Sequence, residues 1–134
     1  MGAIKMLSAN DVKRIAGISG RQYKKVQWHS AEIIVRPFLT IDEYMEVVKQ
    51  IMCDCKGPDG KIVLELIDFA IRMNVICAYA AVELPDNMRD LYYIIYTSDL
   101  YSTIISAVNK NQIEEIASAV YANVFSGCQN GNSL

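Results

Sequence analysis

The residues of this chain that could bind a metal are few, and its cysteines come first. Cys53 and Cys55 form a C-x-C pair, while Cys77 and Cys128 stand alone. Zinc sites usually separate paired cysteines by about two to four residues, which this spacing does not match. We therefore expect four structural thiols, with Cys77 buried in a helix, and we expect no metal and no cofactor.

Residues for acid–base or nucleophilic catalysis are also sparse. His29 is the only histidine, so schemes that need a second imidazole cannot be built. The pairs Asp42–Glu43 and Glu114–Glu115 fall in first turns of expected helices, where negative charge offsets the helix dipole. The sequence contains no phosphate loop, dinucleotide fingerprint or nucleophile elbow. We therefore predict that the protein is not an enzyme. His29 is then a turn residue, with a contact or pH-sensitive role as the alternative.

One segment combines basic and aromatic side chains. β-Branched and aromatic residues favour strands, and they predict a β-hairpin with strands at about residues 21–28 and 31–36. A lone hairpin is barely stable in water, so this one must pack on helices or meet another chain. We predict that it binds a partner protein through Arg21, Tyr23, Lys24, Trp28 and Arg36.

Basic and aromatic residues together can also bind single-stranded nucleic acid. The chain has 13 Lys and Arg against 15 Asp and Glu, a formal net charge of −2. It therefore lacks the basic stripe that nucleic acid requires, and we do not expect nucleic acid as a partner.

The element around which the chain is organised is an apolar stretch at residues 62–83. A helix that is apolar on nearly all sides must be surrounded. A membrane span has few charges, whereas Glu65, Asp68 and Arg72 interrupt this stretch on one face. We predict a central helix buried in protein, with one polar stripe and with Ile76 and Ala80 in its core, and no membrane partner.

Capping and periodicity predict the remaining helices. Thr40 and Glu43 form a capping box, and apolar residues then recur three and four apart to about residue 53. The expected caps of the other helices are Ser8, Asp86 or Asn87, Ser98 or Asp99, and Asn111 with Glu114. Gly127 is the expected end of the last helix.

Tyrosines crowd one predicted helix and its successor. Tyr92 and Tyr96 share a face, so Tyr93 points elsewhere, and Tyr101 follows. Core packing is the first interpretation. A binding interface is the alternative, since tyrosine is enriched at hot spots.

These elements predict a mostly α fold: a bundle of about five helices around the central helix, preceded by a short β-hairpin. Residues 1–20 are a flexible segment with a short helix, residues 21–127 the hairpin plus helical domain, and residues 128–134 a disordered tail. The start lacks the apolar run of a signal peptide, so we expect a cytoplasmic protein with reduced cysteines.

The segment VRPFLTIDEYMEVVKQI, residues 35–51, follows the predicted hairpin and carries Leu39-Thr40, Glu43 and Tyr44. It resembles the tail assembly chaperones of siphophages, small proteins from the structural gene block of tailed phages and prophages. The resemblance covers about residues 21–52, and residues 67–85 resemble other phage-associated proteins. It implies an assembly or virion structural role without catalysis, in the cytoplasm of a bacterial host or in the virion. The partners would be further copies of the chain or other phage structural proteins. The alternative is a small phage-encoded inhibitor or adaptor that binds a host protein.

Overall fold

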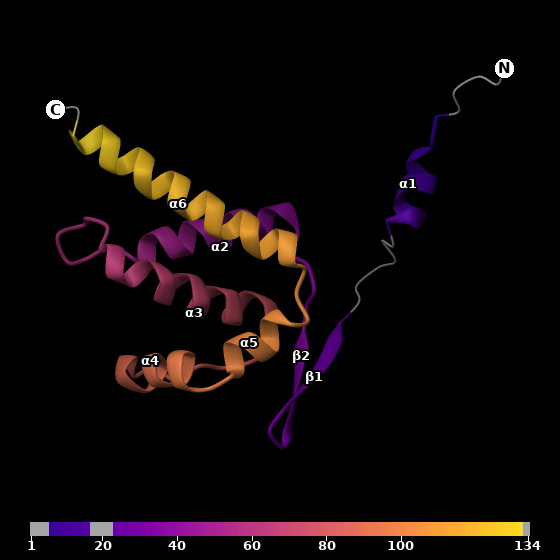
Figure 1. Cartoon of the computed structure of the whole chain (residues 1–134), viewed down its shortest axis with the longest axis horizontal. Helices are drawn as coiled ribbons and strands as arrows, with labels where there is room; N and C mark the ends of the chain where they lie inside the picture. Colours follow the sequence, from indigo (N-terminus) through magenta and orange to yellow (C-terminus); the bar gives the residue numbers. More distant parts are fainter. Residues whose placement is uncertain (1–5, 17–22, 133–134) are drawn as a thin grey trace.

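The computed structural model describes residues 6–16 and 23–132, with side chains placed as far as residue 126. The fold is mostly helical with one antiparallel hairpin before the helical body, as the sequence predicts (Figure 1). Its elements are α1 (Ala9–Ile15), β1 (Lys24–Trp28), β2 (Ala31–Val35), α2 (Ile41–Asp54), the 3-10 helix η1 (Leu64–Leu66), α3 (Ile67–Tyr79), α4 (Met88–Thr97), α5 (Leu100–Ile105) and α6 (Lys110–Asn132).

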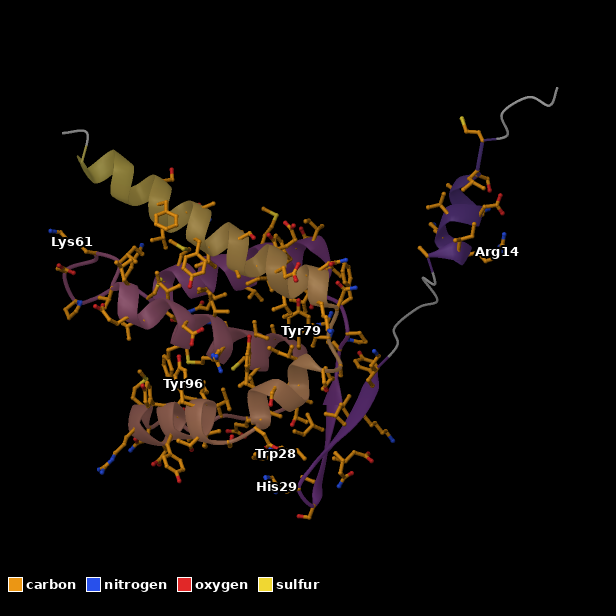
Figure 2. The ribbon with its side chains drawn as sticks, viewed as in Figure 1. Arg14, Trp28, His29, Lys61, Tyr79 and Tyr96 are labelled. Atoms are coloured by element: carbon orange, nitrogen blue, oxygen red, sulfur yellow. The ribbon has the colours of Figure 1, made fainter. Side chains whose placement is uncertain are left out.

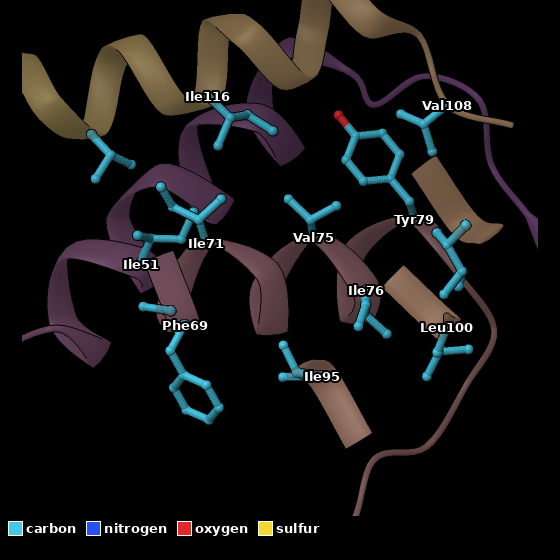
Figure 3. Packing of buried hydrophobic residues seen from close by; sticks show 14 of the residues in the cluster. Ile51, Phe69, Ile71, Val75, Ile76, Tyr79, Ile95, Leu100, Val108 and Ile116 are labelled. Atoms are coloured by element: carbon cyan, nitrogen blue, oxygen red, sulfur yellow. The ribbon is translucent and has the colours of Figure 1, made fainter. Parts of the chain in front are cut away.

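Helix α3 lies in the middle of the helical body, as predicted for the central element. It packs against α2 on one side and against α4 and α5 on the other, and α6 lies along α2 (Figure 1). Val75 and Ile76 of α3 are fully buried, and the side chains around them come from every neighbouring helix (Figure 3). The labelled core residues on those helices are Ile51, Ile95, Leu100 and Ile116, and Val108 joins them from the segment between α5 and α6.

The central helix is shorter than the predicted range of residues 62–83. η1 precedes it, and it ends at Tyr79 because Ala80 is extended, with φ −117° and ψ 144°. Ala80 forms a β-bridge with Val35, and the Ala81 N–H donates to the Ile34 carbonyl at 2.9 Å. Ala80 is buried as expected, but beside β2 rather than in a helix. The backbone of Ala80 and Ala81 therefore forms its hydrogen bonds with the open edge of β2, and these replace the bonds of a further helical turn.

The predicted helix starts are largely confirmed. Thr40 and Glu43 form the capping box of α2, Ser8 caps α1, and Asn87 caps α4. The start of the last helix is the exception. Asn109 accepts the Gln112 N–H at 3.1 Å, so the predicted box at Asn111 is two residues late.

The end of the last helix also differs from the prediction. The backbone of α6 continues through residue 127 to Asn132, and only residues 133–134 of the expected tail lie outside the described part. A glycine inside a helix costs stability without necessarily ending it.

A buried amide ties the linker between β2 and α2 to the helical body. Gln112 Oε1 accepts the Leu39 N–H at 2.8 Å and the hydroxyl of Tyr79, and its Nε2 donates to the Leu39 carbonyl at 3.1 Å. Burial raises the pKa of Tyr79, so its hydroxyl stays protonated and can donate. The network joins the linker, the end of α3 and the start of α6 at one point.

We expect Gln112→Ala to lower the free energy of unfolding by about 3–5 kcal/mol, measured by urea denaturation. The change leaves both backbone groups of Leu39 and the Tyr79 hydroxyl without a buried partner, and each such group costs about 1–3 kcal/mol. Tyr79→Phe removes only the hydroxyl and should cost about 1 kcal/mol. The exposed Gln50→Ala is the matched control. Equal stability of Gln112→Ala and Gln50→Ala would contradict the role given to this network.

Candidate functional site

The hairpin residues predicted to bind a partner differ in what they contact. Arg21 lies outside the described residues. Tyr23 is 53% exposed and Lys24 is also exposed, so both are free to meet another protein. Trp28 and Arg36, in contrast, form hydrogen bonds with other residues of the same chain.

Trp28 holds the tip of the hairpin against α5. Its indole Nε1 donates to Asp99 Oδ1 at 2.7 Å, and its partly buried ring packs on the core. His29 sits in the turn with a left-handed φ of 56°, and its ring lies edge-on to the indole, with centroids 5.1 Å apart (Figure 2). Asp99 is at the N-cap position of α5, but its side chain does not cap the helix: its Oδ1 accepts the indole N–H of Trp28 and lies 3.7 Å from His29 Nε2. The hairpin therefore gains its stability from the helices and from the Ala80 segment.

Arg36 joins the end of β2 to the first turn of α2. Its Nη1 and Nη2 donate to the two carboxylate oxygens of Glu43, each at 2.5 Å. This bidentate bond to Arg36, with further bonds from Thr40, lowers the pKa of Glu43 to about 2. The same bond raises the pKa of Arg36. Glu43 therefore serves the capping box and the ion pair together.

Three large exposed apolar side chains lie at or just before the first turns of α2. Phe38, Ile41 and Met45 are 61%, 69% and 60% exposed. A hollow of about 470 Å³ opens between the starts of α2 and α6, and a second of about 610 Å³ follows, with Tyr44 in the wall of both. The first is lined by Phe38, Leu39, Ile41, Tyr44, Asn109, Asn111, Gln112 and Glu115. The second is lined by Tyr44, Met45, Val48, Lys49, Met52, Cys53, Lys56, Ala119 and Asn123. We refer to these two neighbouring hollows, which share Tyr44, as the α2–α6 groove.

The groove arises because the apolar residues of α2 cover a wider arc of the helix than the part that faces the core. One line, spaced by four and three residues, runs from Tyr44 through Val47 and Ile51 to Cys55, and its last two members are buried. A second line beside it is exposed or partly exposed: Ile41, Met45, Val48 and Met52. The spacing of three and four residues that predicted this helix includes members of both lines and does not separate them. The width of the apolar arc was the signal that could have revealed this surface.

The tyrosine segment forms a second surface, on α4. Tyr92, Tyr93 and Tyr96 are 59%, 67% and 37% exposed, so the prediction of core packing is wrong for them. They are exposed because α4 buries Leu91 and Ile95, which leaves the neighbouring positions at the surface. Tyr101 is partly buried.

Tyr96 is nevertheless tied to the polar stripe of α3. Its hydroxyl donates to Asp68 Oδ2 at 2.6 Å, and Arg72 donates to the same oxygen at 2.9 Å. The Arg72 guanidinium lies 5.1 Å from the Tyr96 ring centroid and 4.8 Å from that of Tyr101. Burial, followed by the bond to Asp68, raises the pKa of Tyr96. These contacts satisfy the cluster inside the chain, whereas the side chains of Phe38, Ile41 and Met45 at the groove remain exposed.

The cysteines and acidic residues do not gather into a metal site in the described part of the chain. Among the described residues, no group of three or more His, Cys, Asp or Glu side chains could hold a metal ion. Cys55 is buried, but Cys53 is exposed. Cys77 is exposed as well, so its predicted burial is wrong: α3 buries Val75, Ile76 and Tyr79, and Cys77 lies between them on the outer face. In the described part of the chain, no helix combines the length and apolarity needed to cross a membrane.

We expect Trp28→Ala to lower the free energy of unfolding by about 2 kcal/mol, because it removes a half-buried ring and its bond to Asp99. The exposed Tyr23→Ala should change it by less than about 0.5 kcal/mol. Thermal melts of both variants measure the difference. A Trp28→Ala protein that melts with the parent would show that the indole does little within the chain and would favour a role in partner binding.

We expect the free energy of unfolding to fall as the pH drops from about 5 to about 2, and to fall less in Glu43→Gln. The pKa of Glu43 is about 2 in the folded chain against its ordinary 4.5. The ion pair with Arg36 is therefore fully stabilising above pH 4.5 and is lost as the carboxylate protonates. Water screens a pair this exposed, so the difference should be about 1 kcal/mol. Parallel pH profiles of the two proteins would contradict this.

Comparison of the chain with protein-family models, with curated proteins and with solved structures gave no match.

Proposed function

We propose that this chain is a non-enzymatic protein that works through protein–protein contacts in the assembly of a phage-type particle. The α2–α6 groove is its main contact surface. The observation that carries the proposal is the exposure of Phe38 and Ile41 at the first hollow of the groove and of Met45 at the second. Contiguous exposed apolar side chains with a polar rim mark interaction surfaces in soluble proteins.

The groove has the form that suits an amphipathic helix. Its apolar walls come from the linker and from the outer line of α2, and Asn109, Asn111 and Glu115 of the opposite wall add polar groups. A bond of 3.3 Å from the Tyr44 hydroxyl to the Glu115 carbonyl fixes the distance between the walls. Helix-in-groove binding places apolar anchors three and four residues apart against such a surface.

The phage part of the proposal is supported by the sequence resemblance. The residues that carry it also build the groove, since Leu39 and Tyr44 line its first hollow and Glu43 begins α2 beside them. An assembly role predicts self-association or binding to other phage structural proteins. The site of action would be the cytoplasm of a bacterial host, with retention in the virion as one outcome of assembly.

The second candidate is a small phage-encoded inhibitor or adaptor that binds a host protein. The exposed faces of Tyr92 and Tyr93 on α4 favour it, because they give the chain a further aromatic surface apart from the groove. Tyrosine is enriched at binding hot spots. A one-to-one complex with a host protein would need no self-association.

Light scattering coupled to size-exclusion chromatography, over a wide range of protein concentrations, separates the two candidates. For an assembly protein we expect the mass to rise above two copies of the 15.0 kDa chain. A mass that stays at one or two copies at every concentration would contradict the assembly proposal and favour the inhibitor or adaptor.

A further inference from the structure

Helix α1 has an apolar edge with nothing against it. None of its residues is buried, and it stands apart from the helical body (Figure 1). Leu7, Val12 and Ile15 are 60%, 52% and 65% exposed. Isolated helices shorter than about 12–15 residues are marginal in water, and α1 has 7 residues. The Ser8 cap alone does not offset that cost, so a docking surface would stabilise α1.

The first hollow of the α2–α6 groove matches this helix. A seven-residue helix is roughly 10 Å long, which is short enough to lie beside the first turns of α2 and α6. Val12 and Ile15, three residues apart, would meet Phe38 and Ile41. The charges are also complementary.

The last turn of α1 carries Lys13 and Arg14, and Arg14 pairs with Asp11 of the same helix at 3.3 Å, so Lys13 is the basic group that α1 offers to a partner. Acidic groups stand at the first hollow, where Glu115 lines the wall and the exposed Asp42 follows Ile41. Opposite charges at the rim of an apolar contact set its orientation more than its strength.

We infer that α1 of one copy docks in the α2–α6 groove of a second copy. This rests on the proposed function, because it assigns the occupant of the groove. In Figure 1 α1 lies apart from the helical body, and we assign the helix that fills the groove to a second copy. The helix and the groove are different surfaces, so a copy that donates its helix can still receive one. Such head-to-tail contacts close into rings or extend into filaments.

The contact between α1 and the groove buries little surface, so we expect it to be weak. A stable interface buries about 1,200–2,000 Å² in total, more than one short helix provides. Self-association through α1 is therefore concentration-dependent and is lost on dilution.

Two single variants test the contact from its two sides. Val12→Asp places a charge on the apolar edge of α1, and Ile41→Lys places one in the groove; both positions are exposed, so the fold tolerates them. Each variant should remain monomeric at concentrations where the parent protein associates. Asn10→Asp on α1 and Leu64→Lys on η1, also exposed, are the matched controls and should associate like the parent.

Mixing the two variants tests whether the helix is exchanged between copies. Val12→Asp keeps an intact groove and Ile41→Lys keeps an intact helix, so an equimolar mixture should form a one-to-one pair although neither variant self-associates. Light scattering of the mixture measures this. Absence of the pair would overturn the inference and point to a helix that folds onto its own chain.

The outcomes separate this inference from the proposed function. If the parent forms large assemblies that neither variant affects, α1 is not the occupant and the assembly proposal stands. If the parent protein forms only dimers and both variants are monomeric, the helix exchange stands and the assembly proposal fails. If the parent is one copy at every concentration, both fail.

Discussion

The structure depends on the buried amide of Gln112. Its side chain forms hydrogen bonds with the N–H and the carbonyl of Leu39 and accepts one from the Tyr79 hydroxyl. The Asn109 N–H adds a bond of 2.9 Å to the Pro37 carbonyl. Three segments far apart in the sequence are thereby fixed at one point: the linker after β2, the end of α3 and the start of α6. A polar network inside a core is costly unless every member is satisfied, and within the described residues no buried side-chain polar atom lacks a partner.

The groove follows from the same constraint. Gln112 holds the Leu39 backbone against the core, and the Leu39 side chain is 1% exposed. Its neighbour Phe38 and the following Ile41 then point away from the core, at the mouth between α2 and α6. The Arg36–Glu43 pair keeps the start of α2 close to the end of β2. The contacts that stabilise the linker therefore also present its apolar residues to a partner, which links the fold to the proposed function.

Local signals in the sequence predicted much of the fold, while long-range contacts decided the rest. The capping box at Thr40 and the hairpin at residues 24–35 depend on neighbouring residues and were found. The end of α3 depends on the pairing of Ala80 with Val35, which no local pattern encodes. The predicted site had the same difficulty, because only the fold shows that Trp28 is held by Asp99. The groove was missed because apolar periodicity identifies a helix without telling which part of a wide apolar arc faces the core.

Hydrogen exchange followed by mass spectrometry, at low and at high protein concentration, tests most directly the claim that the α2–α6 groove is the contact surface. The account predicts slower exchange at high concentration in residues 6–16 and 38–45, since both sides of the contact become ordered together. Exchange in α4 should not change with concentration. Protection that grows in α4 or in the hairpin, with residues 38–45 unaffected, would contradict the account.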